Sequence, residues 1–95
     1  MATLEKQLLE NVREFTAFAR RRLGDPELAA DVVQESLLKA LRSSDELRDQ
    51  EKAKAWFYRI LRRTIIDLYR RRDARDRAMA DIEQEFGGAP DSEQE

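Results

Sequence analysis

The stretch GDPELAADVVQESLLKALR, residues 24–42, decides how the first half of this 95-residue chain folds. Gly24 ends a preceding helix, and Asp25 caps a new helix in which Pro26 takes the first position. Apolar residues then recur at helical spacing as far as residue 42. Because the corner between the two helices is so short, we expect them to be antiparallel neighbours.

Two further helices flank this one. The preceding helix should run from about residue 4 to residue 23, because its apolar residues recur at spacings of three and four. The following helix should begin near residue 51, after a polar break at residues 43–50. Its apolar positions are Ala53, Phe57, Ile60, Leu61, Thr64, Ile65 and Leu68. The fold class we expect is all-α, a compact bundle of three to four helices with a long, basic C-terminal helix.

Composition excludes several classes of protein. The chain has no Cys and no His, which removes thiol chemistry, zinc fingers of any Cys type and the usual general base. There is no Gly-rich phosphate loop either, so we expect no enzyme, no metal and no cofactor. Apolar runs are too short to span a membrane. We therefore expect a cytoplasmic protein that has no membrane partner and is monomeric when free.

Charge is strongly segregated, although the formal net charge is only −2. Residues 56–77 hold eight Arg against three Asp, and residues 78–95 hold six acidic groups and no basic one. A basic block of this kind predicts a surface that binds a polyanion, although a highly charged helix with a disordered end is the alternative. We place a helical domain at residues 1–80 and expect residues 81–95 to be a disordered acidic tail.

Two outward surfaces remain once the buried stripes are assigned. On the helix at residues 26–42, an acidic strip includes an exposed Leu. This strip could dock a basic helical partner, although it could equally be a solvated surface in which Glu35 and Lys39 form an ordinary supporting pair. The strip contains Glu27, Asp31, Gln34, Glu35, Leu38 and Arg42. On the last helix, Arg59, Arg62, Arg63 and Arg70 share an outward strip next to Trp56 and Tyr58. Arginines can follow phosphates and aromatic rings can stack on unpaired bases, although the two aromatic residues could instead wedge the helices together.

Residues 24–42 and 54–72 also carry a family resemblance. The second stretch reads KAWFYRILRRTIIDLYRRR. In order and spacing, the two stretches resemble the second conserved region of bacterial RNA polymerase sigma factors of the extracytoplasmic-function type. The resemblance covers roughly residues 8–75. An unrelated three-helix bundle would explain the helices but not the joint spacing of the two motifs.

The resemblance implies two partners. The helix at residues 26–42 would dock on the clamp coiled coil of the largest subunit of core RNA polymerase. The residues expected to bind polymerase are Asp31, Gln34, Glu35 and Leu38. The loop and helix at residues 43–72 would recognise and melt the minus-ten promoter element and capture flipped bases of its non-template strand. The residues expected to bind DNA are Lys52, Lys54, Trp56, Tyr58, Arg59, Arg62, Arg63 and Arg70.

The resemblance also leaves alternatives open. The family often has Asn where this chain has Arg63, so we expect a phosphate contact at that position. The family's helix-turn-helix domain does not follow in this sequence, and residues 81–95 resemble the start of the linker that leads to it. We therefore expect either an excised domain or a stand-alone sigma-like protein. An anti-sigma factor is a further expected partner. The alternative function is a decoy that binds an anti-sigma factor without engaging DNA.

Overall fold

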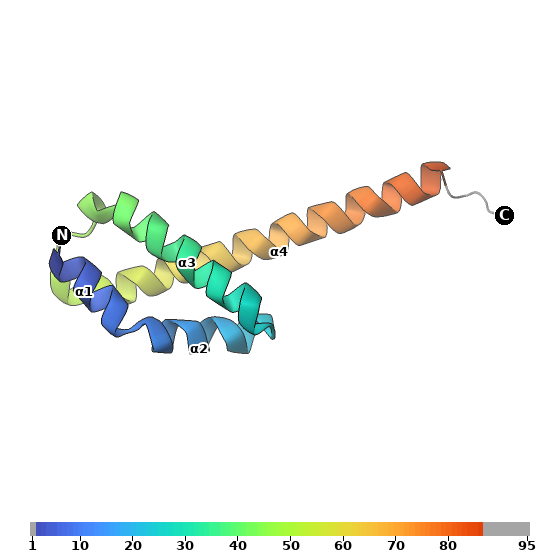
Figure 1. Cartoon of the computed structure of the whole chain (residues 1–95). Helices are drawn as coiled ribbons and strands as arrows, with labels where there is room; N and C mark the ends of the chain where they lie inside the picture. Colours follow the sequence, from blue (N-terminus) through green and yellow to red (C-terminus); the bar gives the residue numbers. More distant parts are fainter. Residues whose placement is uncertain (1, 87–95) are drawn as a thin grey trace.

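The computed structural model describes residues 2–86, and within this range it contains helices but no strand. The elements are α1 (Ala2–Glu10), α2 (Val12–Leu23), α3 (Pro26–Arg42), the 3-10 turns η1 (Ser44–Glu46) and η2 (Gln50–Lys52), and α4 (Ala53–Phe86). Figure 1 shows α1, α2 and α3 gathered around the first part of α4, whose second part projects away from the bundle. The predicted all-α bundle with a long C-terminal helix is confirmed.

The first helix is interrupted at Asn11, where a single helix was predicted. The side-chain nitrogen of Asn11 donates a hydrogen bond of 2.7 Å to the Gln7 carbonyl, and its backbone N–H donates to the Leu8 carbonyl at 3.2 Å. Asn competes for backbone hydrogen bonds in this way and therefore favours helix ends over helix interiors. The chain bends there, so that α1 and α2 both pack against α4 (Figure 1).

The corner between α2 and α3 has the predicted chemistry. Gly24 has φ +70°, and its N–H donates to the Arg20 carbonyl at 2.9 Å, which ends α2. The Asp25 carboxylate accepts from the backbone N–H groups of Glu27 and Leu28, at 3.0 and 3.3 Å. Helices α2 and α3 then run in opposite directions and pack closely against each other (Figure 1).

A single apolar core lies where the four helices meet. It contains Leu4, Leu8, Phe15, Ala19, Ala29, Val32, Val33, Ala40, Ala53, Phe57, Leu61 and Ile65. At its centre the rings of Phe15 and Phe57, from α2 and α4, lie with their centroids 4.3 Å apart. The buried hydroxyls of Ser36 and Thr64 each donate to the carbonyl four residues earlier, so neither carries an unmet donor into the core.

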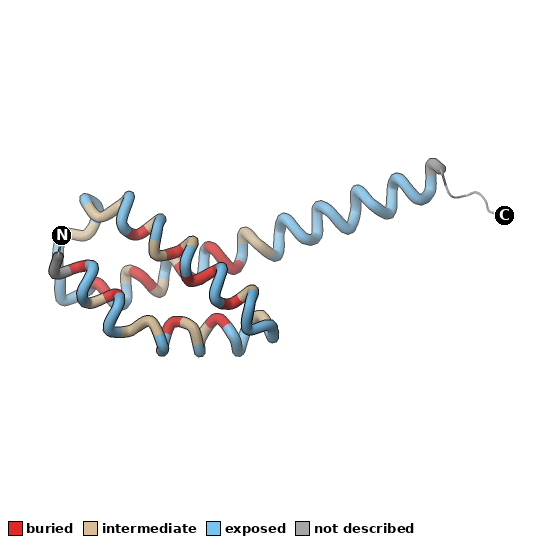
Figure 2. Tube along the Cα trace, in the orientation of Figure 1, coloured by how far each residue is buried: buried red, intermediate tan, exposed pale blue. Residues whose placement is uncertain are grey.

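Helix α4 changes character beyond the core. From residue 69 to residue 84 every side chain is exposed, including Met79 and Ile82 (Figure 2). The domain boundary expected at residue 80 falls inside this helix, which continues to Phe86. Residues 81–86 are therefore helical, whereas a disordered tail was expected from residue 81. The remainder of that tail, residues 87–95, lies outside the described residues.

Candidate functional site

The acidic face of α3, which we define as Asp31, Gln34, Glu35 and Leu38, is brought together as the helical spacing predicts. Asp31 and Gln34 are exposed, and the Leu38 side chain is 48% exposed. A carboxylate, an amide and an isobutyl group thus lie next to one another on the outside of the bundle. This combination offers both hydrogen bonding and apolar contact to a partner helix.

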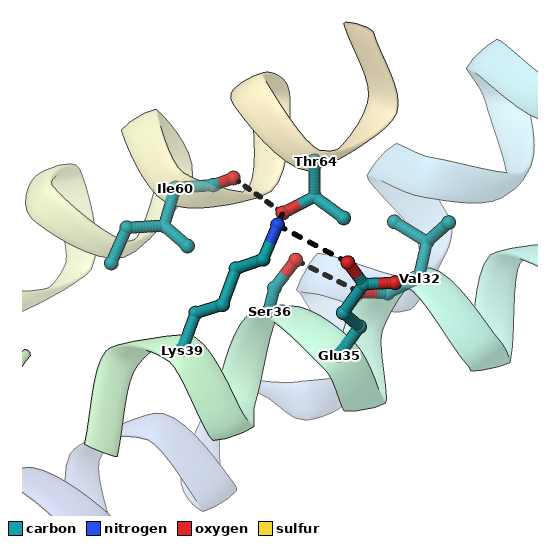
Figure 3. A network of polar contacts seen from close by, with 6 residues as sticks. All are labelled: Val32, Glu35, Ser36, Lys39, Ile60 and Thr64. Atoms are coloured by element: carbon teal, nitrogen blue, oxygen red, sulfur yellow. Dashed lines mark hydrogen bonds and ion pairs between the residues drawn. The ribbon is translucent and has the colours of Figure 1, made fainter. Parts of the chain in front are cut away.

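Glu35 differs from its neighbours because it is tied to the bundle. Its Oε2 lies 3.2 Å from Nζ of Lys39, one turn along α3. The same ammonium donates a hydrogen bond of 3.3 Å to Oγ1 of Thr64 on α4, and that hydroxyl donates to the Ile60 carbonyl at 2.9 Å. Figure 3 shows this chain of contacts between α3 and α4. A substitution at Glu35 therefore disturbs the junction of the two helices as well as the acidic face.

The arginine row of α4, which we define as Arg59, Arg62, Arg63 and Arg70, lies at helical spacings along one side of the helix. All four side chains are exposed, and none forms an ion pair with any residue in the described range. The half-exposed Ile66 lies between Arg63 and Arg70 on the same side of the helix. Guanidinium groups that are not neutralised by carboxylates remain available to phosphate oxygens.

Lys54 and Tyr58 are placed differently, because both contact Glu14 of α2. The Lys54 ammonium lies 2.8 Å from Glu14 Oε1, and the Tyr58 hydroxyl donates to Glu14 Oε2 at 2.6 Å. The Tyr58 ring also meets Phe15 and Phe18 edge-on, at centroid distances of 5.2 and 5.1 Å. Both residues thus join α4 to α2. The placement of Tyr58 favours its wedge alternative, and its contact with a base stays a prediction.

The two titratable groups of this junction respond to each other. The hydrogen bond from Lys54, followed by that from Tyr58, lowers the pKa of the Glu14 carboxyl. Partial burial, followed by the hydrogen bond to Glu14, raises the pKa of the Tyr58 hydroxyl to about 12. Both shifts hold the pair in the state seen here, an ionised carboxylate that accepts from a neutral phenol.

The remaining expected DNA-binding residues lie where α4 begins. Trp56 is half-buried and packs against the core, and Lys52 is exposed at the end of η2. The preceding loop is ordered by Asp49, whose carboxylate accepts from the Glu51 backbone N–H at 3.0 Å. Trp56 and the arginine row therefore lie on the same helix, α4, and the loop leads directly into its first turn.

Sequence analysis missed a contact at the far end of the row. The Tyr69 hydroxyl donates to the Arg22 carbonyl at 2.6 Å, and the Arg22 guanidinium lies 3.7 Å from the centroid of the Phe18 ring. Arg22 thereby comes to lie near Arg62 beside a surface hollow of about 300 Å³. The available signal was the spacing of Arg62, Ile65 and Tyr69, which puts them on one side of α4.

Within residues 2–86, no three Asp, Glu, His or Cys side chains lie close enough to hold a metal ion together. None of the helices described is both long enough and apolar enough to cross a membrane. The two charged surfaces, on α3 and α4, are therefore the features that a function has to explain.

Comparison with known proteins identifies the family. The model of the Sigma-70 region 2 family matches residues 8–75. The RNA polymerase sigma factor SigV of Bacillus subtilis (strain 168) is 39% identical over 70 residues, which cover 74% of this chain and 42% of that protein. The ECF RNA polymerase sigma factor EcfG of Rhodopseudomonas palustris (strain TIE-1) is 36% identical over 70 residues, which cover 74% of this chain and 39% of that protein.

A third relative, a probable RNA polymerase sigma factor of Haemophilus influenzae, is 32% identical over 65 residues, which cover 67% of this chain and 34% of that protein. The chain thus spans less than half the length of each of these three relatives. No solved structure matches it significantly. The match to the family model, together with these relatives, confirms the resemblance found in the sequence: the chain belongs to the Sigma-70 region 2 family, of the extracytoplasmic-function type.

Proposed function

We propose that this chain is a transcription initiation module that binds core RNA polymerase through α3 and the minus-ten promoter element through α4. The observation that carries the proposal is the arginine row, whose four exposed guanidiniums have no carboxylate partner among the described residues. Unneutralised charge of this kind is best explained by an anionic ligand. The family relationship supports promoter DNA as that ligand.

The acidic face of α3 supports the polymerase half of the proposal. Asp31 and Gln34 are exposed and make no side-chain hydrogen bond or ion pair within residues 2–86. Their polar groups are therefore available to a partner. Leu38 adds an exposed apolar group beside them. A partner helix with basic and apolar side chains, such as one strand of the clamp coiled coil, would complement all three groups.

The start of α4 supports the DNA half. The arginine row begins one turn after Trp56 and continues along the same helix. The phosphates of a single DNA strand could contact these arginines one after another. Lys52 and the loop before it precede Trp56 in the chain, whereas the arginine row follows it. An extruded base could bind at this loop. In this proposal Lys54 and Tyr58 hold α4 against α2, so that these groups keep their relative positions.

Binding to core RNA polymerase tests the docking surface, with Asp31→Lys as the informative variant. The substitution reverses an exposed charge that has no ion-pair partner in the described structure, so the fold should be retained. Glu10→Lys is the matched control, because it makes the same charge change at an exposed position on α1. Glu35→Lys is less suitable, since it would also break the contact between Glu35 and Lys39.

We expect Asp31→Lys to weaken polymerase binding at least tenfold and Glu10→Lys to change it less than twofold. Equal binding by both variants would show that α3 does not dock on polymerase. If the unsubstituted chain does not bind polymerase but binds an anti-sigma factor, the decoy function is correct. Circular dichroism of each variant would show that the helical content is unchanged.

A further inference from the structure

A hollow on the surface between α2 and α4 exposes apolar side chains next to charged ones. The packing of the two helices against each other does not explain why these apolar side chains are left open to solvent. The hollow is lined by Arg22, Arg62, Ile65, Ile66 and Tyr69 and has a volume of about 300 Å³. Ile66 and Tyr69 are 48% and 41% exposed, which leaves an isoleucine and an aromatic ring open to solvent beside two guanidiniums. The volume is at the lower end of the range for small-ligand sites.

The chemistry of the lining indicates a ligand that is both planar and anionic. Ile65, Ile66 and the Tyr69 ring offer apolar contact and a stacking surface, while Arg22 and Arg62 offer charge and fixed donors. No carboxylate lines the hollow, and neither guanidinium forms an ion pair within residues 2–86. A somewhat larger hollow at the α2–α3 corner is less suited to an anion, because the Asp25 carboxylate lines it.

The walls of the hollow are held in place from both sides. Arg22 is fixed by its stacking on Phe18, at 3.7 Å, and by the hydrogen bond that its carbonyl accepts from Tyr69 at 2.6 Å. The same hydrogen bond orients the Tyr69 ring, and Ile65 is anchored in the core. A preorganised wall reduces the entropy that is lost when a ligand binds.

We propose that this hollow receives an unpaired base of single-stranded DNA, with Tyr69 and Ile66 against the base and Arg22 and Arg62 beside its flanking phosphates. The proposal rests on the proposed DNA-binding function and adds a second base contact, which lies on the α2 side of α4. Ile66 also lines a shallow hollow with Arg63 and Arg70, in which Asp67 takes part. A strand whose base sits beside Tyr69 would therefore continue along the arginine row.

Photocrosslinking of the full chain to a single-stranded decamer of thymidines containing 5-iododeoxyuridine tests the proposal. Trypsin would release Tyr69 in the peptide TIIDLYR, residues 64–70, and would release Trp56 and Tyr58 in the separate peptide AWFYR, residues 55–59. The position of the crosslink is therefore read directly from peptide masses. We expect a crosslink in the peptide of residues 64–70, and we expect Ile66→Glu to reduce its yield at least tenfold.

The matched control is Ile82→Glu, because Ile82 is on the same helix, is also 48% exposed and lies outside the hollow. Its crosslink yield should equal that of the unsubstituted chain. A crosslink confined to residues 55–59 would overturn the hollow as a base site while leaving the proposed DNA binding intact. The absence of crosslinks in both peptides would contradict both proposals, and equal losses from the two variants would show that the hollow has no special part in binding.

Discussion

Removal of one arginine from the row should reduce the salt dependence of single-stranded DNA binding by a fixed amount. The row extends over twelve residues, from Arg59 to Arg70, and the eleven rises of 1.5 Å between them give a length of about 16 Å. At about 3.4 Å per nucleotide, the spacing of one strand stacked as in B-form DNA, this length corresponds to roughly five nucleotides. Four exposed guanidiniums can therefore contact phosphates of one short strand at the same time.

The expected magnitude follows from counterion release. Each phosphate contact on a single strand adds about 0.7 to the slope of log K against log salt concentration, so the complete row adds about 2.8. Over a fourfold rise in salt concentration, one contact is then worth a factor of about 2.6 in affinity, and four are worth a factor of about 50. Arg63→Gln should lower the slope by about 0.7.

Fluorescence anisotropy of a labelled single-stranded decamer, titrated at several salt concentrations, measures this slope. Arg13→Gln is the matched control, because Arg13 is exposed on α2 outside the row and should leave the slope unchanged. If Arg63→Gln weakens binding without lowering the slope, Arg63 does not contact phosphate. If both variants lower the slope equally, binding reflects the total charge and not the row.

Two further predictions concern the bundle itself. Gly24→Ala should lower the free energy of unfolding by about 1–2 kcal/mol, because a residue with a Cβ is strained at φ +70°. The cause is backbone strain and not a clash, since a Cβ there would meet no atom within 4 Å. Urea unfolding measures the effect, and an unchanged midpoint would contradict this prediction. The free energy of unfolding should fall as pH rises from about 10 to about 12, because the unfolded chain releases the Tyr58 proton at a lower pH than the folded chain does. Tyr58→Phe should remove that part of the pH dependence, and an identical profile would show that the phenol does not report folding.

Local features of the fold could be predicted because they depend on neighbouring residues. The αL glycine, the Asp25 cap and the first-turn proline of α3 act within one helical turn, so residues 24–26 are sufficient to place the corner. The buried stripes likewise follow from helical periodicity. The break at Asn11 was missed because the apolar spacing continues across it. The structure shows the break in two hydrogen bonds of Asn11, from its side chain to the Gln7 carbonyl and from its backbone N–H to the Leu8 carbonyl.

The candidate site could be predicted only in part. Periodicity placed the acidic face and the arginine row on the outside of their helices, but it does not show which side chains reach another helix. The hydrogen bonds from Tyr58 to Glu14 and from Tyr69 to Arg22 join residues 44 and 47 positions apart. Such pairs depend on how α2 lies against α4, which helical spacing alone does not determine. The sequence therefore left open whether Tyr58 stacks on a base or wedges the helices together, and in the structure its ring lies against Phe15 and Phe18.

If one bundle joins polymerase to promoter DNA, the chain should hold both partners at the same time. We would measure the retention of a labelled non-template minus-ten strand on core RNA polymerase with and without this chain. We expect the chain to increase retention, Asp31→Lys to remove the increase and Glu10→Lys to preserve it. Equal retention with and without the chain, under conditions in which the chain itself is bound to polymerase, would show that the bundle does not join the two partners.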